Sequence, residues 1–287
     1  MKRAGQGALL ALAAMCTPAA HGQPLRPAPQ SQPAPAFGPF AGVARQGALL
    51  LGTAPAGTTQ LTLDDLPIEM ARDGRFLIAF DRDAGPHAAL VAILADGRRV
   101  TKDFDVVPGD WRIERLDTVA KTPVPDAEFE RRRPAELDQI KAARAIRSDA
   151  DGWRQRFIWP VTGRISGLFG AQRIYRGEPG SYHGGVDVAK PTGTPVVAPA
   201  DGVVVLAAPS AFTMEGNLLM IDHGMGLNSA FLHLSQIEVK VGEHVRQGQE
   251  IGRVGATGRA SGPHLHWAMM WQGRRIDPMR VAGAMGQ

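Results

Sequence analysis

Three short stretches decide how this chain folds and what it can do: His183-Gly-Gly-Val-Asp187, Phe231-Leu-His233-Leu-Ser235 and Gly262-Pro-His264-Leu-His266. Together they contain four histidines and one aspartate. Two histidines and one carboxylate can bind Zn²⁺ and leave the fourth tetrahedral position open to water, which is the arrangement of a hydrolytic zinc site. Two further histidines then remain to move protons. The sequence therefore predicts an active site that uses a metal ion for hydrolysis.

The spacing within these stretches lets their side chains converge. Residues two apart on a strand point to the same face, so His264 and His266 project together while Leu265 points into the core. His183 and Asp187 are four apart, which also places them on one face of a strand. The two intervening glycines disfavour a helix and allow close backbone approach. We therefore expect separate segments of the chain to meet at one metal ion.

Each stretch taken alone also has a structural explanation. A His-x-His pair on a strand is more often a packing or surface feature than a pair of ligands. His233, between two leucines, has the pattern of a half-buried structural histidine. Only the joint occurrence of the three stretches favours a site. His223 follows a predicted strand and is interpreted as structural, and His87 and His244 are interpreted as uninvolved.

The start of the 287-residue chain has the pattern of an export signal. Met1-Lys2-Arg3 is positively charged, an apolar run follows, and Ala20-His21-Gly22 is a suitable cleavage site, so residues 1–22 are predicted to be a signal peptide too short to span a bilayer. An ordinary buried helix is the alternative. Residues 23–41 are rich in proline and predict an extended linker. We expect a soluble protein that is periplasmic or secreted.

Cysteine and charge content exclude several classes of site and partner. Cys16, inside the predicted signal, is the only cysteine, so the mature protein is predicted to lack disulfides and thiolate metal ligands. No later stretch is apolar enough to span a membrane. The net charge of +4 favours anionic surfaces such as cell wall or headgroups, although ordinary solubility explains it equally well. No nucleic-acid motif is present, so we expect no nucleic-acid partner.

Residues 42–120 predict a small β-sandwich of immunoglobulin-like type. Asp73-Gly74 and Asp96-Gly97 are hairpin turn signals between short apolar runs. The segment has one histidine and no cluster of catalytic residue types, so we interpret it as a support, targeting or regulatory module. The runs expected to be strands are 48–52, 76–80, 89–94 and 101–106.

Residues 121–152 are charged and predict a short helical connector. Pro134 is well placed to open the helix. Arg131-Arg132-Arg133 is either an anionic contact or a solvated run of charge. The residues that give the helix one sparse apolar face are Leu137, Ile140 and Ile146.

Residues 153–287 predict an antiparallel β domain, which makes the whole chain mainly β. Glycine and proline are frequent between the apolar runs, and no long helical periodicity is present. The expected strands are 203–206, 217–221, 229–234, 250–254 and 264–271.

The three stretches resemble the motifs of the lysostaphin-type (LytM-like) zinc endopeptidases. The resemblance covers about residues 155–280 and includes four supporting matches. More loosely, the preceding β module and connector resemble the exported Gram-negative members of that family. The supporting matches are Gly193-Thr-Pro-Val196, Ala200-Asp-Gly-Val203, Val239-Lys-Val-Gly242 and Ile276-Asp277-Pro278.

The resemblance implies a role for each of the five site residues. His183, Asp187 and His266 become the ligands of one Zn²⁺ per chain, and His233 and His264 become the catalytic pair. A neutral imidazole can take a proton from water at neutral pH, so we assign the general base to His264. His233 then donates a hydrogen bond that stabilises the oxyanion or orients the water.

The chain departs from many relatives at Phe231, where those relatives carry a tyrosine two residues before the catalytic histidine. Any contribution from that hydroxyl is absent here, whereas packing can be preserved. Arg173, Tyr175 and Tyr182 lie just before the first ligand and are candidates for lining a substrate groove.

The family likeness predicts hydrolysis of peptide cross-links in peptidoglycan, with stem peptides as substrate. Export together with the Gram-negative-like architecture favours cross-links that contain D-alanine and diaminopimelate over glycine bridges. The alternative is a catalytically silent relative that binds or activates a separate cell-wall amidase. Such scaffolds lack metal ligands, yet all five key residues are present here.

Overall fold

The computed structural model describes residues 34–116, 127–208 and 210–285. The predicted signal peptide and most of the predicted linker lie outside the described residues. In the described parts of the chain, no helix is both long and apolar enough to cross a bilayer.

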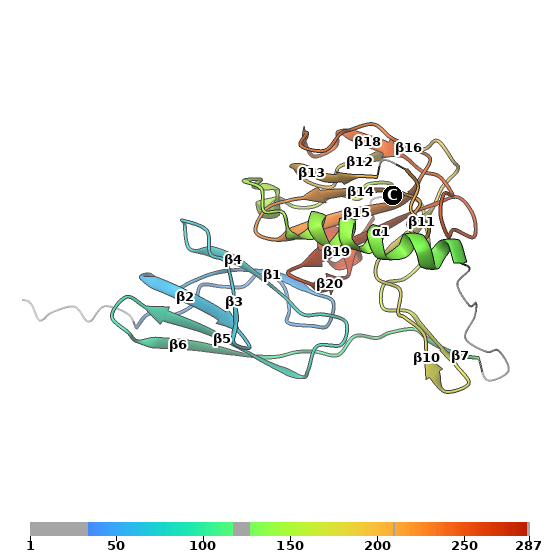
Figure 1. The fold of residues 1–287 in the computed structure, drawn as a ribbon. Coiled ribbons are helices and arrows are strands. Elements are labelled where there is room, and N and C mark those ends of the chain that lie inside the picture. Colours follow the sequence, from blue (N-terminus) through green and yellow to red (C-terminus); the bar gives the residue numbers. More distant parts are fainter. Residues whose placement is uncertain (1–33, 117–126, 209, 286–287) are drawn as a thin grey trace, which may run out of the picture. The chain divides into compact units, whose positions relative to one another are not determined.

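The C-terminal half is built around an eight-stranded sheet in which every pairing is antiparallel (Figure 1). The order is β17-β13-β14-β15-β19-β11-β8, and β20 pairs with β19. The predicted β domain is confirmed, and its strands are β8 (Arg164–Gly167), β11 (Val186–Ala189), β13 (Gly202–Ala207), β14 (Asn217–Asp222), β15 (Leu227–Leu234), β17 (His244–Val245), β19 (His264–Trp271) and β20 (Arg274–Ile276).

Strand β19 shows why this sequence folds as a sheet. Its even and odd positions alternate between two environments, with Leu265, Trp267, Met269 and Trp271 buried and the intervening side chains half-buried. Full burial of large apolar side chains on one face stabilises each by roughly 1.5–3 kcal/mol. The predicted outward projection of His264 and His266 from one face is therefore confirmed.

Smaller elements complete this half of the chain. A three-stranded sheet has the order β12-β18-β16. The final helix begins after Asp277, whose side chain accepts a hydrogen bond from the amide of Met279. These elements are β12 (Pro195–Val197), β16 (Gln236–Ile237), β18 (Glu250–Arg253), the 3-10 turn Gly152–Arg154 and α2 (Pro278–Ala282).

Residues 34–116, here called the N-terminal module, form β structure. Strands β1 and β4 pair, and a second sheet has the order β3-β2-β5-β6. The Asp96-Gly97 turn joins β5 to β6 as a hairpin. The immunoglobulin-like assignment remains a prediction. The strands are β1 (Leu49–Thr53), β2 (Thr58–Leu63), β3 (Leu66–Pro67), β4 (Arg75–Ala79), β5 (His87–Leu94) and β6 (Arg99–Asp105).

Residues 34–41, the described end of the predicted linker, pack onto the strands of this module. Phe40 lies 5.0 Å from Phe104 between ring centroids, and Ala41 pairs with Leu51. Phe37 lies 6.2 Å from Phe76. Aromatic burial therefore orders residues that the high proline content led us to place in an extended segment.

The connector contains one helix, α1 (Ala127–Ala145), and two details of its prediction are wrong. Pro134 lies inside the helix, because the helix begins a full two turns earlier. Of the predicted apolar face only Ile140 is buried, whereas Leu137 and Ile146 are exposed. Ile140 and Ala143 pack on the face formed by β13, β14 and β15, so α1 covers part of the large sheet.

The N-terminal module and the C-terminal half also share a small sheet. Strand β7 (Ile113–Leu116) pairs in parallel with β9 (Gln172–Tyr175), which pairs with β10 (Glu178–Pro179). Residues 35–287 accordingly form a single unit.

Candidate metal centre and histidine pair

Three side chains converge at the centre of the large sheet. Asp187 on β11 lies directly opposite His266 on β19, so both point to the same face. Asp187 Oδ1 lies 2.8 Å from His266 Nδ1 and 3.1 Å from His183 Nε2. The two histidine nitrogens are 3.0 Å apart. We call His183, Asp187 and His266 the ligand cluster.

The route by which His183 reaches the cluster differs from the prediction. Strand β11 begins at Val186, so His183 and Asp187 do not share a strand face. His183 lies in the preceding segment, where its amide donates to Ala171 and its carbonyl accepts from Gly170. The backbone of residues 170 and 171 therefore positions His183.

Glycines make room for the cluster. A Cβ on Gly185 would lie 2.7 Å from His266 Nε2, and one on Gly167 would lie 2.2 Å from Asp187 Oδ2. Such contacts would displace a ligand side chain. A Cβ on Gly184 would meet only Arg275, at an ordinary 3.4 Å. Of the two glycines between His183 and Asp187, Gly185 thus shows the expected close approach to a ligand side chain and Gly184 does not.

The donor set fits a divalent ion that prefers nitrogen and oxygen. Ligand atoms around a tetrahedral Zn²⁺ with bonds of about 2.1 Å lie about 3.4 Å apart, close to the observed spacing. His183 Nδ1 donates to the carbonyl of Leu168 at 3.0 Å, which leaves Nε2 as the lone pair facing the cluster. The side chains of His183 and Asp187 remain 25% and 21% exposed, so one side of the cluster is open.

The charges in the cluster favour a cation. Burial alone would raise the pKa of Asp187, but its interactions with the His183 and His266 imidazoles outweigh burial and hold that pKa well below its usual range. Burial would lower the pKa of His183, but the bond to Asp187 raises it overall. For His266 burial prevails and lowers the pKa. An ionised carboxylate therefore lies between two imidazoles.

His233 and His264, here called the histidine pair, lie beside the ligand cluster. Their ring centroids are 4.9 Å apart, and His233 lies 6.2 Å from His266. His264 Nε2 is 3.8 Å from Asp187 Oδ1. The structure thus brings together all five residues singled out in the sequence.

Backbone carbonyls set the tautomer of both members of the pair. His233 Nδ1 donates to the carbonyl of Thr257 at 2.8 Å, and His264 Nδ1 donates to that of Gly262 at 2.7 Å. Each neutral ring then presents Nε2 as a proton acceptor. Burial lowers the pKa of His233 to about 4, more than the hydrogen bond from its ring to Thr257 restores. His233 is therefore neutral at pH 7 and accepts rather than donates at Nε2.

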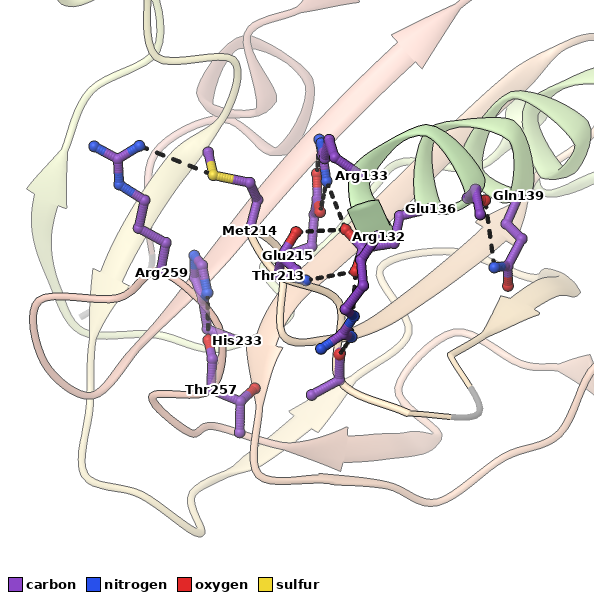
Figure 2. Close-up of polar contacts among 12 residues, drawn as sticks. Arg132, Arg133, Glu136, Gln139, Thr213, Met214, Glu215, His233, Thr257 and Arg259 are labelled. Atoms are coloured by element: carbon purple, nitrogen blue, oxygen red, sulfur yellow. Dashed lines mark hydrogen bonds and ion pairs between the residues drawn. The ribbon is translucent and has the colours of Figure 1, made fainter. Parts of the chain in front are cut away.

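The backbone of His233 is held by the loop that precedes β14. Figure 2 shows the contacts of that loop with α1 and the bond from the His233 ring to Thr257. The φ of His233 is 64°, a conformation that non-glycine residues seldom adopt, and its amide donates to the carbonyl of Glu215. The Glu215 carboxylate receives two bonds from Arg133 of α1, at 2.6 and 2.8 Å. Buried Glu136 of α1 accepts from the amide of Thr213 at 2.9 Å.

The contacts of α1 also concern the run Arg131-Arg132-Arg133, for which the sequence left two interpretations, an anionic contact or a solvated run of charge. Arg133 is paired with Glu215, and Arg132 donates to the carbonyl of Ala211 at 2.6 Å. Two of the three arginines therefore make specific contacts within the chain. The sequence offers no signal for this network, because its partners are separated by roughly eighty residues.

The N-terminal module contacts the segment that carries His183. Arg82, 8% exposed, donates to the carbonyl of Gly170 at 3.2 Å and to the side chain of Gln172 at 3.0 Å. Gly170 in turn donates to the carbonyl of His183. Asp81 accepts from the hydroxyl of Tyr182 at 3.1 Å. Sequence reasoning missed Arg82 and Asp81, since nothing local distinguishes them.

A groove of about 960 Å³ begins at His183 and Asp187. Arg173, Tyr175 and Tyr182 line it, as proposed from their position before the first ligand. The buried Phe231 points into the core, consistent with a packing role. His223 is fully buried and bonded to Asp201 and Ser229, so its structural interpretation is confirmed.

The C-terminal half of the chain is similar to known peptidases. Residues 181–278 match the family model of peptidase family M23. Peptidoglycan DD-endopeptidase ShyA of Vibrio cholerae is 41% identical over 131 residues, 44% of this chain and 29% of that protein. DD-carboxypeptidase/endopeptidase Mpg of Neisseria meningitidis is 42% identical over 123 residues, 42% of this chain and 27% of that protein.

The likeness in structure extends further along the chain. A solved structure assigned to peptidase M23 from Pseudomonas aeruginosa superposes with a TM-score of 0.64 and 27% identity, covering 85% of this chain and 96% of that one. The curated relatives named above are matched over less than a third of their length. The motifs, the sheet and the family match agree for the C-terminal half: this chain contains a peptidase M23 domain of the LytM/lysostaphin type.

Proposed function

We propose that this chain is a zinc-dependent endopeptidase that hydrolyses peptide cross-links of peptidoglycan outside the cytoplasm. The convergence of His183, Asp187 and His266 beside the histidine pair carries the proposal. The names of the curated relatives support the substrate class.

The ligand cluster would hold one zinc ion through His183 Nε2, Asp187 Oδ1 and His266 Nδ1. When bound, zinc supplies Lewis-acid polarisation of the scissile carbonyl and lowers the pKa of its water to about 7. The carbonyl of Leu168 fixes the ring of His183 in the tautomer that such binding needs.

The histidine pair would orient the attacking water and transfer its proton. His264 Nε2, which faces the cluster, accepts the proton of the attacking water and returns it to the leaving amine. His233 Nε2 is an acceptor in its neutral form, so we propose that it orients the water. Of the two roles expected for His233, we thus choose orientation of the water over stabilisation of the oxyanion. A neutral His233 ring has no proton on Nε2, so it cannot donate from that atom to an oxyanion.

The test combines metal analysis with digestion of cell walls. The purified full chain is expected to contain one zinc per molecule and to release cross-linked stem peptides from sacculi as monomers, with product masses that identify the severed bond. Removal of zinc by a chelator should stop release, and added zinc should restore it. Stoichiometric zinc without release from any wall type would instead indicate a silent scaffold that acts through a cell-wall amidase.

A further inference from the structure

A second cavity opens beside the ligand cluster, between α1 and the large sheet. Its volume is about 270 Å³, and His266, Gly184 and Tyr182 form its wall toward the cluster. Ile140 and Arg144 of α1 form the opposite wall. This cavity, which we call the helix-side pocket, shares Ser181, Tyr182 and Met214 with the groove that begins at His183 and Asp187, so the two are neighbours.

The helix-side pocket contains two arginines from different parts of the chain. Arg144 is four residues after the buried Ile140, so it points from the same face of α1 toward the sheet. Arg275 on β20 lies opposite Met270 of β19, so both side chains occupy the sheet face that also carries His266.

Neither guanidinium takes part in an ion pair within the described parts of the chain, and Arg275 lies over the ring of Tyr182 at 5.1 Å. Nε of Arg144 is buried there without a hydrogen-bond partner, and none of the ion pairs in these parts includes Arg144 or Arg275. The carboxylate of Glu215 also lines the pocket, but its two oxygens already bond to Arg133. Burial, and then the positive charge of Arg275, lower the pKa of Arg144 by more than the negative charge of Glu215 raises it. The pocket therefore contains two guanidiniums and a single carboxylate, and that carboxylate is already bonded to a third arginine.

Two arginines in one pocket, one with an unpartnered donor, lower the stability of the fold unless an anionic ligand binds between them. A buried guanidinium donor without a partner destabilises the fold, and two like charges facing one cavity add to that cost. Arginine also presents a planar fork of donors that matches a carboxylate. The remaining lining is largely apolar, which strengthens any charge-assisted bond formed inside it.

We propose that the helix-side pocket binds a free carboxylate of the peptide substrate through Arg144 and Arg275. The inference rests on the proposed endopeptidase function and adds a determinant of substrate choice to it. The strand from His266 to Met270 is about 13 Å long, the span of roughly four extended residues. The recognised carboxylate thus belongs to a residue within about four positions of the bond that is cut.

The test uses one synthetic stem peptide, containing D-alanine and diaminopimelate, in two forms. One form has free carboxylates and the other has them as primary carboxamides, which are similar in shape and neutral. Binding to the zinc-free full chain is measured by calorimetry, and cleavage by the zinc-loaded chain is measured separately. We expect the free acid to bind roughly ten- to hundredfold more tightly than the amide, with the difference in cleavage appearing in KM rather than kcat.

Variants then assign the difference to the two arginines. Arg144→Gln and Arg275→Gln should each reduce the preference for the acid to within a fewfold, while binding of the amide stays unchanged. Arg131→Gln, an exposed position on the same helix outside the pocket, is the matched control and should keep the preference. The comparison of the two peptides with the unaltered chain holds even where a variant fails to fold.

The outcomes separate this inference from the proposed function. Cleavage of both peptides with equal KM would overturn the carboxylate pocket and leave the endopeptidase intact. Arg144-dependent binding of the acid without cleavage would support the pocket and count against the endopeptidase. Absence of measurable binding by either peptide would overturn the pocket.

Discussion

The ligand cluster and the histidine pair contain the same chemical group in opposite surroundings. In the cluster an ionised carboxylate lies between two imidazoles and raises the pKa of His183. In the pair only neutral carbonyls contact the Nδ1 atoms, and burial lowers the pKa of His233 to about 4. The neighbours of an imidazole therefore decide whether it attracts a cation or keeps a free lone pair.

The two groups also depend on different parts of the chain. Arg82 of the N-terminal module supports the segment that carries His183, whereas Glu136 and Arg133 of α1 support the loop that holds His233. Elements distant in sequence thus hold the two groups separately. Each of the following experiments should affect one group and leave the other unchanged.

The largest difference is expected from alanine substitutions in the two groups. His266→Ala should lose stoichiometric zinc and reduce release of stem peptides to background, because two donors cannot retain the ion. His233→Ala should keep zinc and lower kcat by roughly 10²–10⁴. Metal analysis and initial rates on the same preparations check both. Equal loss of zinc in the two variants would contradict the division into two groups.

Removing the module's support should weaken the ligand cluster alone. Arg82→Met leaves the carbonyl of Gly170 without its donor, so we expect zinc affinity to fall roughly tenfold to hundredfold, as for other residues that orient ligands. Competition with a chelator measures the affinity. Arg98→Met, at an exposed arginine of the same module that pairs with Asp96, is the control. Unchanged affinity in Arg82→Met would show that the cluster is independent of the module.

Acid should act on the ligand cluster before it acts on His233. The pKa of His183 is raised, so in the zinc-free protein its proton is lost as pH rises through that value, and zinc affinity increases with pH. Below that pKa we expect a fall of up to roughly tenfold per pH unit. His233 protonates only near pH 4. Zinc titrations from pH 8 to 5 should show the first effect in the unaltered chain and equally in His233→Ala, since His233 does not titrate in that range.

A smaller effect is expected from the helix that supports the pair. Glu136→Gln removes the charge that accepts from Thr213 and should lower kcat by a factor on the order of ten without changing zinc affinity. It should also reduce the free energy of unfolding by about 1–3 kcal/mol, since the Glu136 side chain is buried. Glu128→Gln, whose carboxylate is 65% exposed on the same helix, should change neither. A loss of zinc in Glu136→Gln would contradict separate support.

Much of the fold and all five central residues follow from local sequence. Alternation in residues 264–271 predicts the strand and the side from which His264 and His266 project, because burial of one face fixes its register. The interior position of Pro134 does not follow from sequence. Its preference for a first turn is a local rule, and contacts of α1 with the loop before β14 overrule it.

The supports of the site are harder to predict. The carbonyls of Leu168, Thr257 and Gly262 set three histidine tautomers, and a backbone carbonyl has no identity in the sequence. Arg82 and Glu136 act across 88 and 77 residues of chain, so only the folded structure reveals them.

The open space at Gly184 offers a place for a spectroscopic reporter. A side chain there meets only the flexible end of Arg275, whereas one at Gly185 collides with His266. Cys16 is the only native cysteine, so Gly184→Cys followed by thiol-directed labelling would give a single fluorophore once that residue is changed to serine. Its emission would follow occupancy of the helix-side pocket in real time, without any cleavage.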